Sequence, residues 1–401
     1  MKRHLKRAGA AFLAAVCLLL YGGASVSAQE GPGSLYALSA VLMDGQTGRV
    51  LYGKDADTVR AMASTTKVMT CILALEHANG ADEVVISDKA AIQPEIKMHV
   101  KKGERYRMQD LLYAMMLKSY NDVAVAVAEH IGGSVSGFAE MMNSKALALG
   151  CKATHFVTPN GLDAIDEKGE MHSTTAADLA LIMRYAIQNP TFLSLTQMRD
   201  YSFWDMDKTR NFTIHNANAY LDMREGMISG KTGFTGNAGY CYVGAYESKG
   251  RVFIVALLGC GWPNNKTYKW RDMDTLLNYG EEQYHLQEYW QEPRLLPVIV
   301  ENGIPDSGDL TEAAYTDLTC RFSKKASLQK VLMRQGEEVK ITQTVKETVT
   351  APVQEGEKLG EIVYSIDDFC LASYDLLAKS AVERLTMEWC VEDIFRRFFH
   401  D

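Results

Sequence analysis

The chain has 401 residues, 47% of them hydrophobic and 23% charged, and its formal net charge is −8 at pH 7. This length predicts about two domains with a substantial core. The acidic balance argues against a nucleic-acid-binding protein.

Residues 1–28 have the pattern of a secretory signal peptide. Basic side chains stand at positions 2, 3, 6 and 7, an apolar run covers residues 8–21, and small residues end at Ala28. A membrane span needs about 20 apolar residues, so this run is short, although retention as an N-terminal anchor stays open. We expect cleavage after Ala28 and export of the remainder, which carries 38 basic and 50 acidic side chains.

Seven cysteines follow the leader, at wide spacing and without a C-x-x-C pair. Neither a disulfide framework nor a cysteine zinc site is expected, although one bridge stays open in an oxidising compartment. Cys71, Cys241 and Cys260 stand in apolar segments and are expected in the core.

The first motif follows a predicted hairpin, with strands at residues 36–43 and 50–52. Ser64-Thr65-Thr66-Lys67 then opens a segment whose apolar residues recur at helical spacing. Residues i and i+3 share a helix face, so the Ser64 hydroxyl and the Lys67 amine can meet. A lysine can activate a serine only if its pKa falls from about 10.4 towards neutrality. The alternative is a helix cap beside a solvated lysine.

The second motif lies between two predicted helices. Residues 111–117 form a methionine-rich apolar stretch, expected to be core, and a second apolar helix follows from residue 123. Ser119-Tyr120-Asn121 separates them. Ser119 is suited to relaying a proton and Asn121 to binding a substrate amide, while helix capping is the alternative for both.

The third motif lies in a glycine-rich, edge-type strand at residues 228–236. Strands are also predicted at residues 240–246 and 251–258, and helices at 178–187 and 274–284. Lys231 and Thr232 would offer a cation and a hydroxyl to a carboxylate lying along this strand; the alternative is a turn with a surface lysine. His172 stands apart from any carboxylate pattern and is expected to be structural.

The C-terminal part predicts a linker at residues 293–297, a small β domain and a tail helix over residues 376–399. One face of that helix is apolar, with Met387, Cys390, Val391, Ile394, Phe395 and Phe398. Too many charges interrupt it for a membrane span, so it is expected to lie at a membrane interface. Docking on the protein itself is the alternative.

The three motifs, in this order and at this spacing, resemble the low-molecular-mass penicillin-binding proteins that act as D-alanyl-D-alanine carboxypeptidases of the peptidase S11 type. The resemblance covers nearly the whole mature chain. It implies an α+β fold: a serine β-lactamase/transpeptidase-like catalytic domain, with an antiparallel sheet flanked by helices, at residues 29–292. A β-rich domain at 293–373 and an amphipathic, membrane-associating helix at 374–401 follow.

The resemblance also implies the roles of the motif residues. Ser64 is similar to the family's nucleophile, Lys67 to its base and Ser119 to its proton relay. Substrate binding falls to the remaining residues of the set: Asn121, Lys231, Thr232, Gly233 and Phe234. The backbone N–H groups of Ser64 and Phe234 correspond to an oxyanion hole. Tyr120 stands where many relatives carry a smaller residue.

The implied function is a serine-type D-Ala-D-Ala carboxypeptidase that removes the terminal D-alanine from peptidoglycan stem peptides and is acylated by β-lactams. No metal, organic cofactor or nucleic acid is implied. The expected location is the extracytoplasmic face of the bacterial cytoplasmic membrane, with the C-terminal helix on the membrane surface.

Two other readings stay open. A class A-like β-lactamase would need a glutamate-activated water, and neither Glu167 nor Glu170 is followed four residues later by asparagine. A non-catalytic cell-wall-binding homologue is the other. The sequence does not separate carboxypeptidase from endopeptidase activity, because both cleave a D,D-peptide bond.

Overall fold

The computed structural model describes residues 31–320 and 330–399, so the expected leader lies outside the described residues. The helical segments are η1 (Ala63–Thr66, 3-10), α2 (Lys67–His77), α3 (Asp88–Ala91), α4 (Met108–Lys118), α5 (Asn121–Gly132), α6 (Val135–Ala148), α7 (Ala176–Ala186), α8 (Pro190–Gln197), α9 (Tyr220–Met223), α10 (Tyr268–Gln283) and α11 (Met387–Phe399).

The strands of the first domain are β1 (Ser39–Asp44), β2 (Val50–Lys54), β3 (Glu83–Val85), β4 (Arg105–Arg107), β5 (Asp200–Trp204), β6 (Asn211–His215), β7 (Met227–Thr235), β8 (Gly239–Ser248) and β9 (Arg251–Leu258). The remaining strands are β10 (Tyr284–Glu288), β11 (Val298–Glu301), β12 (Tyr315–Thr316), β13 (Leu318–Cys320), β14 (Lys330–Arg334), β15 (Lys340–Val345), β16 (Thr348–Thr350), β17 (Lys358–Ile366) and β18 (Phe369–Ala378).

A five-stranded antiparallel sheet organises the first domain, in the order β2-β1-β9-β8-β7. Side chains of a strand alternate between its two faces. In β1, Val41 and Met43 therefore enter one hydrophobic core, while Ala40 and Leu42 enter the other. Burial on both faces explains why this strand is apolar throughout, and the α+β expectation is confirmed.

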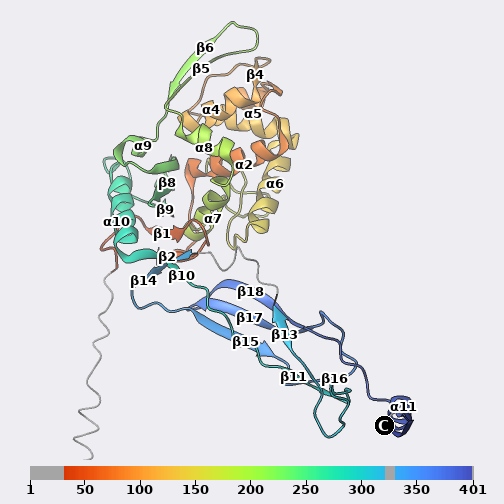
Figure 1. The fold of residues 1–401 in the computed structure, drawn as a ribbon. Helices are drawn as coiled ribbons and strands as arrows, with labels where there is room; N and C mark the ends of the chain where they lie inside the picture. The colour runs from red at the N-terminus through yellow and green to blue at the C-terminus, as the bar shows by residue number, and fades with distance from the viewer. Residues whose placement is uncertain (1–30, 321–329, 400–401) are drawn as a thin grey trace, which may run out of the picture.

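Helices cover both faces of this sheet (Figure 1). Helix α10 packs against β1, β8 and β9 on one face, and α7 packs against the same three strands on the other. Helix α2 packs against α7, and α4, α5, α6 and α8 pack around α2, with α8 also against β7; these helices supply most of the larger core. The methionine-rich stretch in α4 is buried there, as expected, and so are Cys71 and Cys241, while Cys260 is buried in the core under α10.

The predicted hairpin is confirmed as β1 and β2, and the two strands after the third motif are confirmed as β8 and β9. Strand β7 lies at the sheet's edge, as its glycine content indicates. Residues 232–235 of this strand line the cleft described below.

The second domain is built from a four-stranded sheet (β13-β18-β17-β15) and a three-stranded one (β12-β11-β16). Strand β14 pairs with β10, which follows α10 directly, and its Leu332 is buried in the first domain's core. Arg49, on the β1–β2 turn, donates hydrogen bonds to the Leu332 carbonyl (3.1 Å) and to the Glu337 carboxylate. These contacts couple the two domains.

The tail differs from its prediction. Strand β18 extends to Ala378 and helix α11 begins only at Met387, so the expected boundary at 373/374 falls inside a strand. Leu376 and Ala378 are buried in the second domain's core, and this burial holds them in the sheet. Within the described residues, no helix has the length and apolar character needed to cross a membrane.

Candidate active site

Ser64 and Lys67 lie at the junction of the 3-10 turn η1 and helix α2, where their side chains meet. Lys67 Nζ donates a hydrogen bond to Ser64 Oγ at 2.9 Å. Lys67 is fully buried, and the Ser64 side chain caps neither helical segment. The alternative of a capping serine beside a solvated lysine is therefore wrong.

Lys67 is held in place by acceptors from two other segments. Its Nζ donates to Asn121 Oδ1 (2.9 Å) and to the Asn160 carbonyl (2.6 Å). Burial, reinforced by the positive charge of Lys231, lowers the pKa of Lys67 well below its usual range, while Asp122 raises it to a smaller extent. In its neutral form the amine keeps two N–H groups, for the Asn121 and Asn160 oxygens, and its lone pair at Ser64 can accept the hydroxyl proton.

The second motif joins helices α4 and α5. Ser119 ends α4 in a left-handed conformation (φ 65°), and Asn121 begins α5. Asn121 Nδ2 donates to the Pro94 and Glu95 carbonyls, at 3.3 and 3.1 Å. The Asn121 amide thus bridges Lys67 and the segment before residue 96, an orienting task that the sequence does not predict.

The third motif lies on β7, opposite the other two. Lys231 Nζ donates to Ser119 Oγ at 2.9 Å and to the Thr232 carbonyl at 2.8 Å. Burial lowers the pKa of Lys231 to about 7. A Cβ at Gly233 would lie 3.0 Å from the Ser64 nitrogen, so a larger residue would require β7 and the nucleophile's backbone to move apart by a few tenths of an ångström.

The three motifs surround one cleft of about 430 Å³. Its lining includes six of the eight predicted site residues: Ser64, Ser119, Asn121, Thr232, Gly233 and Phe234. The other two, Lys67 and Lys231, are buried behind it and reach Ser64 and Ser119 by the hydrogen bonds above. All eight residues are thus brought together.

A loop between α6 and α7 supplies the Asn160 carbonyl. Thr70 donates to the Pro159 carbonyl at 2.6 Å. His172 Nδ1 accepts from the Val157 nitrogen (2.9 Å), and its Nε2 lies 2.8 Å from Thr66 Oγ1. Burial lowers the pKa of His172 to about 3, so the ring stays neutral and its Nδ1 can accept the hydrogen bond from the Val157 N–H group. The expectation that His172 is structural is consistent with these contacts.

Lys269, on α10, also lines the cleft, and the sequence analysis missed it. It is 2% exposed, and its Nζ lies over the rings of Tyr240 and Trp270, at 4.7 and 4.4 Å. Burial lowers the pKa of Lys269 to about 8. The signal available in the sequence was the pair Lys269-Trp270, three residues after Lys266; the pair lies in the first turn of α10.

Comparisons with known proteins relate the chain to one family. A family model described as D-alanyl-D-alanine carboxypeptidase matches residues 25–260, and one described as the C-terminal domain of penicillin-binding protein 5 matches residues 329–384. The chain is 29% identical to D-alanyl-D-alanine carboxypeptidase DacF of Bacillus subtilis, over 95% of each chain. It is 31% identical to a D-alanyl-D-alanine endopeptidase of Escherichia coli, over 51% of this chain and 65% of that one. The solved structure of penicillin-binding protein 5 from Haemophilus influenzae matches with a TM-score of 0.66 at 26% identity, covering 88% of this chain and 100% of that one.

Proposed function

This chain belongs to the D-alanyl-D-alanine carboxypeptidase family, and on that premise we propose how its side chains remove the terminal D-alanine from peptidoglycan stem peptides. The protein is a serine-type peptidase, and its relatives of known structure include penicillin-binding proteins. The observation that carries the mechanism is the 2.9 Å hydrogen bond from a fully buried lysine, Lys67, to Ser64 Oγ.

Acylation begins when neutral Lys67 accepts the proton of Ser64. The freed oxygen attacks the carbonyl carbon of the penultimate D-alanine, and the backbone N–H groups of Ser64 and Phe234 stabilise the resulting oxyanion. Such a donor can contribute about 3–4 kcal/mol to transition-state stabilisation.

The leaving D-alanine must receive a proton on its nitrogen. Ser119 relays to it the proton that Lys67 took from Ser64, and the hydrogen bond from Lys231 Nζ orients the Ser119 hydroxyl for this step. Lys67 is then neutral again and can take a proton from the water that hydrolyses the ester. Thr232 binds the terminal carboxylate along the open edge of β7, and Asn121 keeps Lys67 directed at Ser64. Water then hydrolyses the ester on Ser64. A β-lactam enters the same path and leaves a covalent adduct on Ser64.

A class A-like β-lactamase is less well supported. Glu170, one of the two glutamates considered for activating water, faces His155 and has a side chain 61% exposed. The presence of a second domain, matched by the penicillin-binding protein 5 model, also favours the peptidase. The assembled motif residues argue against a non-catalytic homologue.

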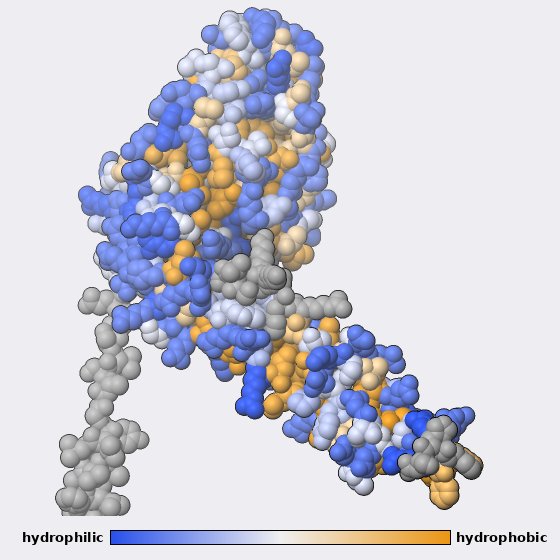
Figure 2. All heavy atoms as spheres, in the orientation of Figure 1, coloured by the Kyte–Doolittle hydropathy of each residue, from blue (hydrophilic) through white to orange (hydrophobic). Residues whose placement is uncertain are grey.

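We further propose that the protein acts outside the cytoplasmic membrane, held at its surface by α11. The residues at one helical face of α11 are exposed, with Met387, Val391 and Ile394 at 81%, 47% and 61%. Figure 2 shows hydrophobic side chains at the surface at this end of the second domain, far from the catalytic domain. One contact between α11 and the domain is polar, a hydrogen bond from Arg397 Nη2 to the Gly308 carbonyl at 2.7 Å. This arrangement leaves the apolar face available to a lipid interface.

The activity is tested by incubating the protein with a pentapeptide stem and, separately, with a cross-linked muropeptide dimer. The proposal expects free D-alanine from the pentapeptide at a rate well above dimer cleavage. Faster cleavage of the dimer would assign the protein to endopeptidases, like the Escherichia coli relative.

A further inference from the structure

A second group of chemically active side chains lies in the loop between α6 and α7, outside the cleft. His155 and Ser173 pair at the base of this loop, each backbone N–H bonding the other's carbonyl at 2.9 Å. Ile165 and Met171 form a second bridge further out. The first arm of the loop continues to Asn160, whose carbonyl holds Lys67. An interaction that holds this loop in place therefore also holds the acceptor of the proposed catalytic base, Lys67.

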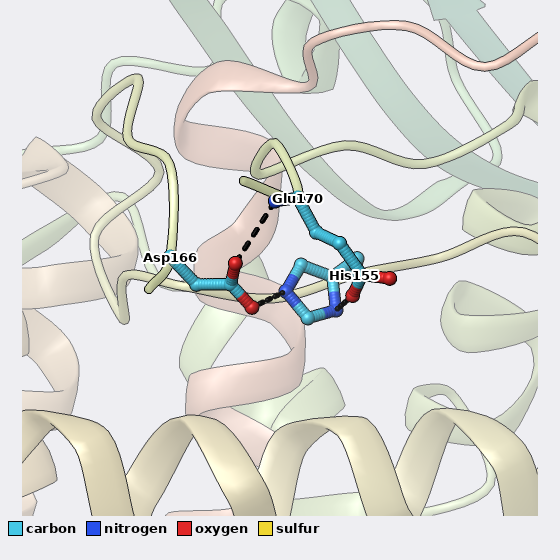
Figure 3. A group of neighbouring side chains, drawn as sticks. All are labelled: His155, Asp166 and Glu170. Atoms are coloured by element: carbon cyan, nitrogen blue, oxygen red, sulfur yellow. Dashed lines mark hydrogen bonds and ion pairs between the residues drawn. The ribbon is translucent and has the colours of Figure 1, made fainter. Parts of the chain in front are cut away.

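His155 lies between two carboxylates of this loop, Asp166 and Glu170 (Figure 3). Asp166 Oδ1 accepts the backbone N–H groups of Lys168 (2.8 Å) and Glu170 (2.9 Å), and these bonds hold the pKa of Asp166 below its usual range. Asp166 Oδ2 lies 3.0 Å from His155 Nε2. An ionised carboxylate is an acceptor only, so the proton belongs on Nε2 and the neutral ring presents its lone pair at Nδ1.

The Nδ1 side of the ring faces Glu170. Nδ1 and Glu170 Oε2 are 3.4 Å apart, longer than an ordinary N–H···O hydrogen bond. Two ligands of a tetrahedral zinc ion, each about 2.0–2.2 Å from the metal, are roughly 3.4 Å from one another. The side chains of His155 and Glu170 are 27% and 61% exposed, so an ion can enter from solvent.

We propose that His155 Nδ1 and the Glu170 carboxylate bind a divalent cation, with zinc the best fit, and that Asp166 fixes the histidine tautomer. A metal-bound histidine usually donates its other N–H to a carboxylate, which is the position of Asp166. An imidazole with one carboxylate suits zinc better than magnesium or calcium, which prefer oxygen ligands. Water completes the coordination.

The bound ion would join the base of the loop, at His155, to its outer turn, at Glu170. This closes the loop around the arm that carries Asn160 and stabilises the folded protein by mass action. The proposal is independent of the peptidase assignment, since it concerns binding rather than turnover. The competing account is an ion pair, in which a protonated His155 bonds both carboxylates and no metal binds.

The test is a zinc titration of the metal-stripped, full-length protein against a fluorescent zinc chelator. The wild type is expected to bind one zinc ion that Glu170→Gln weakens about tenfold or more, while Asp166→Asn weakens it about 10–100-fold. Glu167→Gln is the matched control, because Glu167 is an exposed carboxylate in the same loop outside the cluster. It should leave the zinc affinity unchanged.

Glu170→His separates the two accounts, because it keeps a metal ligand and removes the negative charge. The metal site predicts that this variant binds zinc as tightly as the wild type or more tightly, with a rise in Tm on adding zinc. Equal zinc affinity of the wild type and Glu170→Gln, or a Glu170→His variant that gains nothing from zinc, would overturn the proposal in favour of the ion pair.

Discussion

Among single residues, the two buried lysines have different roles: Lys67 is the proposed base, and Lys231 orients Ser119 and lowers the pKa of Lys67. Burial lowers the pKa of both, and the charge of Lys231 lowers that of Lys67 further. Since a base acts in its neutral form, Lys231 helps to keep Lys67 active. The pair titrates as a coupled system, so its pH behaviour is the signature to examine.

Replacing Lys231 with methionine is expected to move the acid limb of the acylation pH profile to higher pH. The like charge that disfavours protonation of Lys67 is then gone, so the pKa of Lys67 rises and a higher pH is needed to free the base. The measurement is the second-order rate of penicillin acylation against pH. Lys118→Met is the control, because Lys118 also lines the cleft but does not act on the pKa of Lys67. An unmoved limb in Lys231→Met would contradict the coupling.

Lys269 is expected to contribute to recognition of the substrate's carboxylate. It is a buried cation lining the cleft, and its Nζ lies over aromatic rings and bonds only a carbonyl, that of Lys266, among the hydrogen bonds of the described residues. Lys269→Met should raise KM about tenfold, or 1.4 kcal/mol, for an acyl-D-alanyl thioester whose leaving group carries a carboxylate. The same thioester with an uncharged leaving group should be unaffected.

Lys266→Met provides the comparison for Lys269. Lys266 lines the same cleft but is exposed, so its charge is screened by water and its loss should change KM little. If Lys269→Met slowed both thioesters equally and lowered Tm, Lys269 would be a packing residue with no part in recognition.

At the scale of elements, the loop carrying Asn160 depends on one close backbone contact. Gly161 has φ +85°, and a Cβ there would lie 2.0 Å from the carbonyl oxygen of Ala63, next to the nucleophile. Gly161→Ala is expected to destabilise the fold by about 2 kcal/mol or more and to slow acylation, because it displaces both Asn160 and Ser64.

Gly169→Ala is the matched control for this prediction. Gly169 has the same φ, +85°, in the same loop, but a Cβ there meets nothing within 4 Å. Gly169→Ala should lower the free energy of unfolding only by the backbone strain, about 1 kcal/mol, and should leave the acylation rate normal. The measurements are thermal unfolding and the rate of penicillin labelling for both variants. If Gly161→Ala and Gly169→Ala lost stability and acylation rate equally, the close contact with Ala63 would be unimportant.

The sequence predicts some of these elements well for a physical reason. The spacing of Ser64 and Lys67 places them together through local helical geometry alone. Short runs of apolar residues identify β8 and β9, which are buried on both faces. The hydrogen bonds of Lys67 to Asn160 and of Asn121 to Pro94 depend instead on how distant loops fold back. Backbone carbonyls carry no sequence signal, so such contacts cannot be read from residue types.

In the tail, the predicted start of the helix is wrong. The sequence analysis places residues 376–378 in the tail helix, yet they belong to β18, where the second domain's core buries Leu376 and Ala378. Tertiary burial thus extends the strand, and the helix begins at residue 387.

At the scale of the whole molecule, the second domain separates the cleft from α11 (Figure 1). Truncation after Leu385 should therefore release the protein from membranes while D-alanine release from a soluble peptide stays normal. Each large apolar side chain buried at an interface contributes roughly 1.5–3 kcal/mol, so losing the face of α11 removes most of the attraction. Fractionation of cells expressing each form measures this.

The full-length double variant Val391→Glu/Ile394→Glu keeps the helix and charges its exposed face, and it should also leave the membrane. Unchanged membrane association of both forms would point to another anchor, such as an uncleaved leader. Cutting at 385 rather than near 374 matters, because a cut near 374 would remove the end of β18.

The most direct test of the account is the fate of Ser64. Wild-type protein incubated with a penicillin should carry one adduct, which mass spectrometry places on the peptide containing Ser64. Ser64→Ala should lose both the adduct and the release of D-alanine from a pentapeptide while unfolding at an unchanged Tm. An adduct on another residue, or D-alanine release by Ser64→Ala at the wild-type rate, would contradict the assignment of Ser64 as the nucleophile.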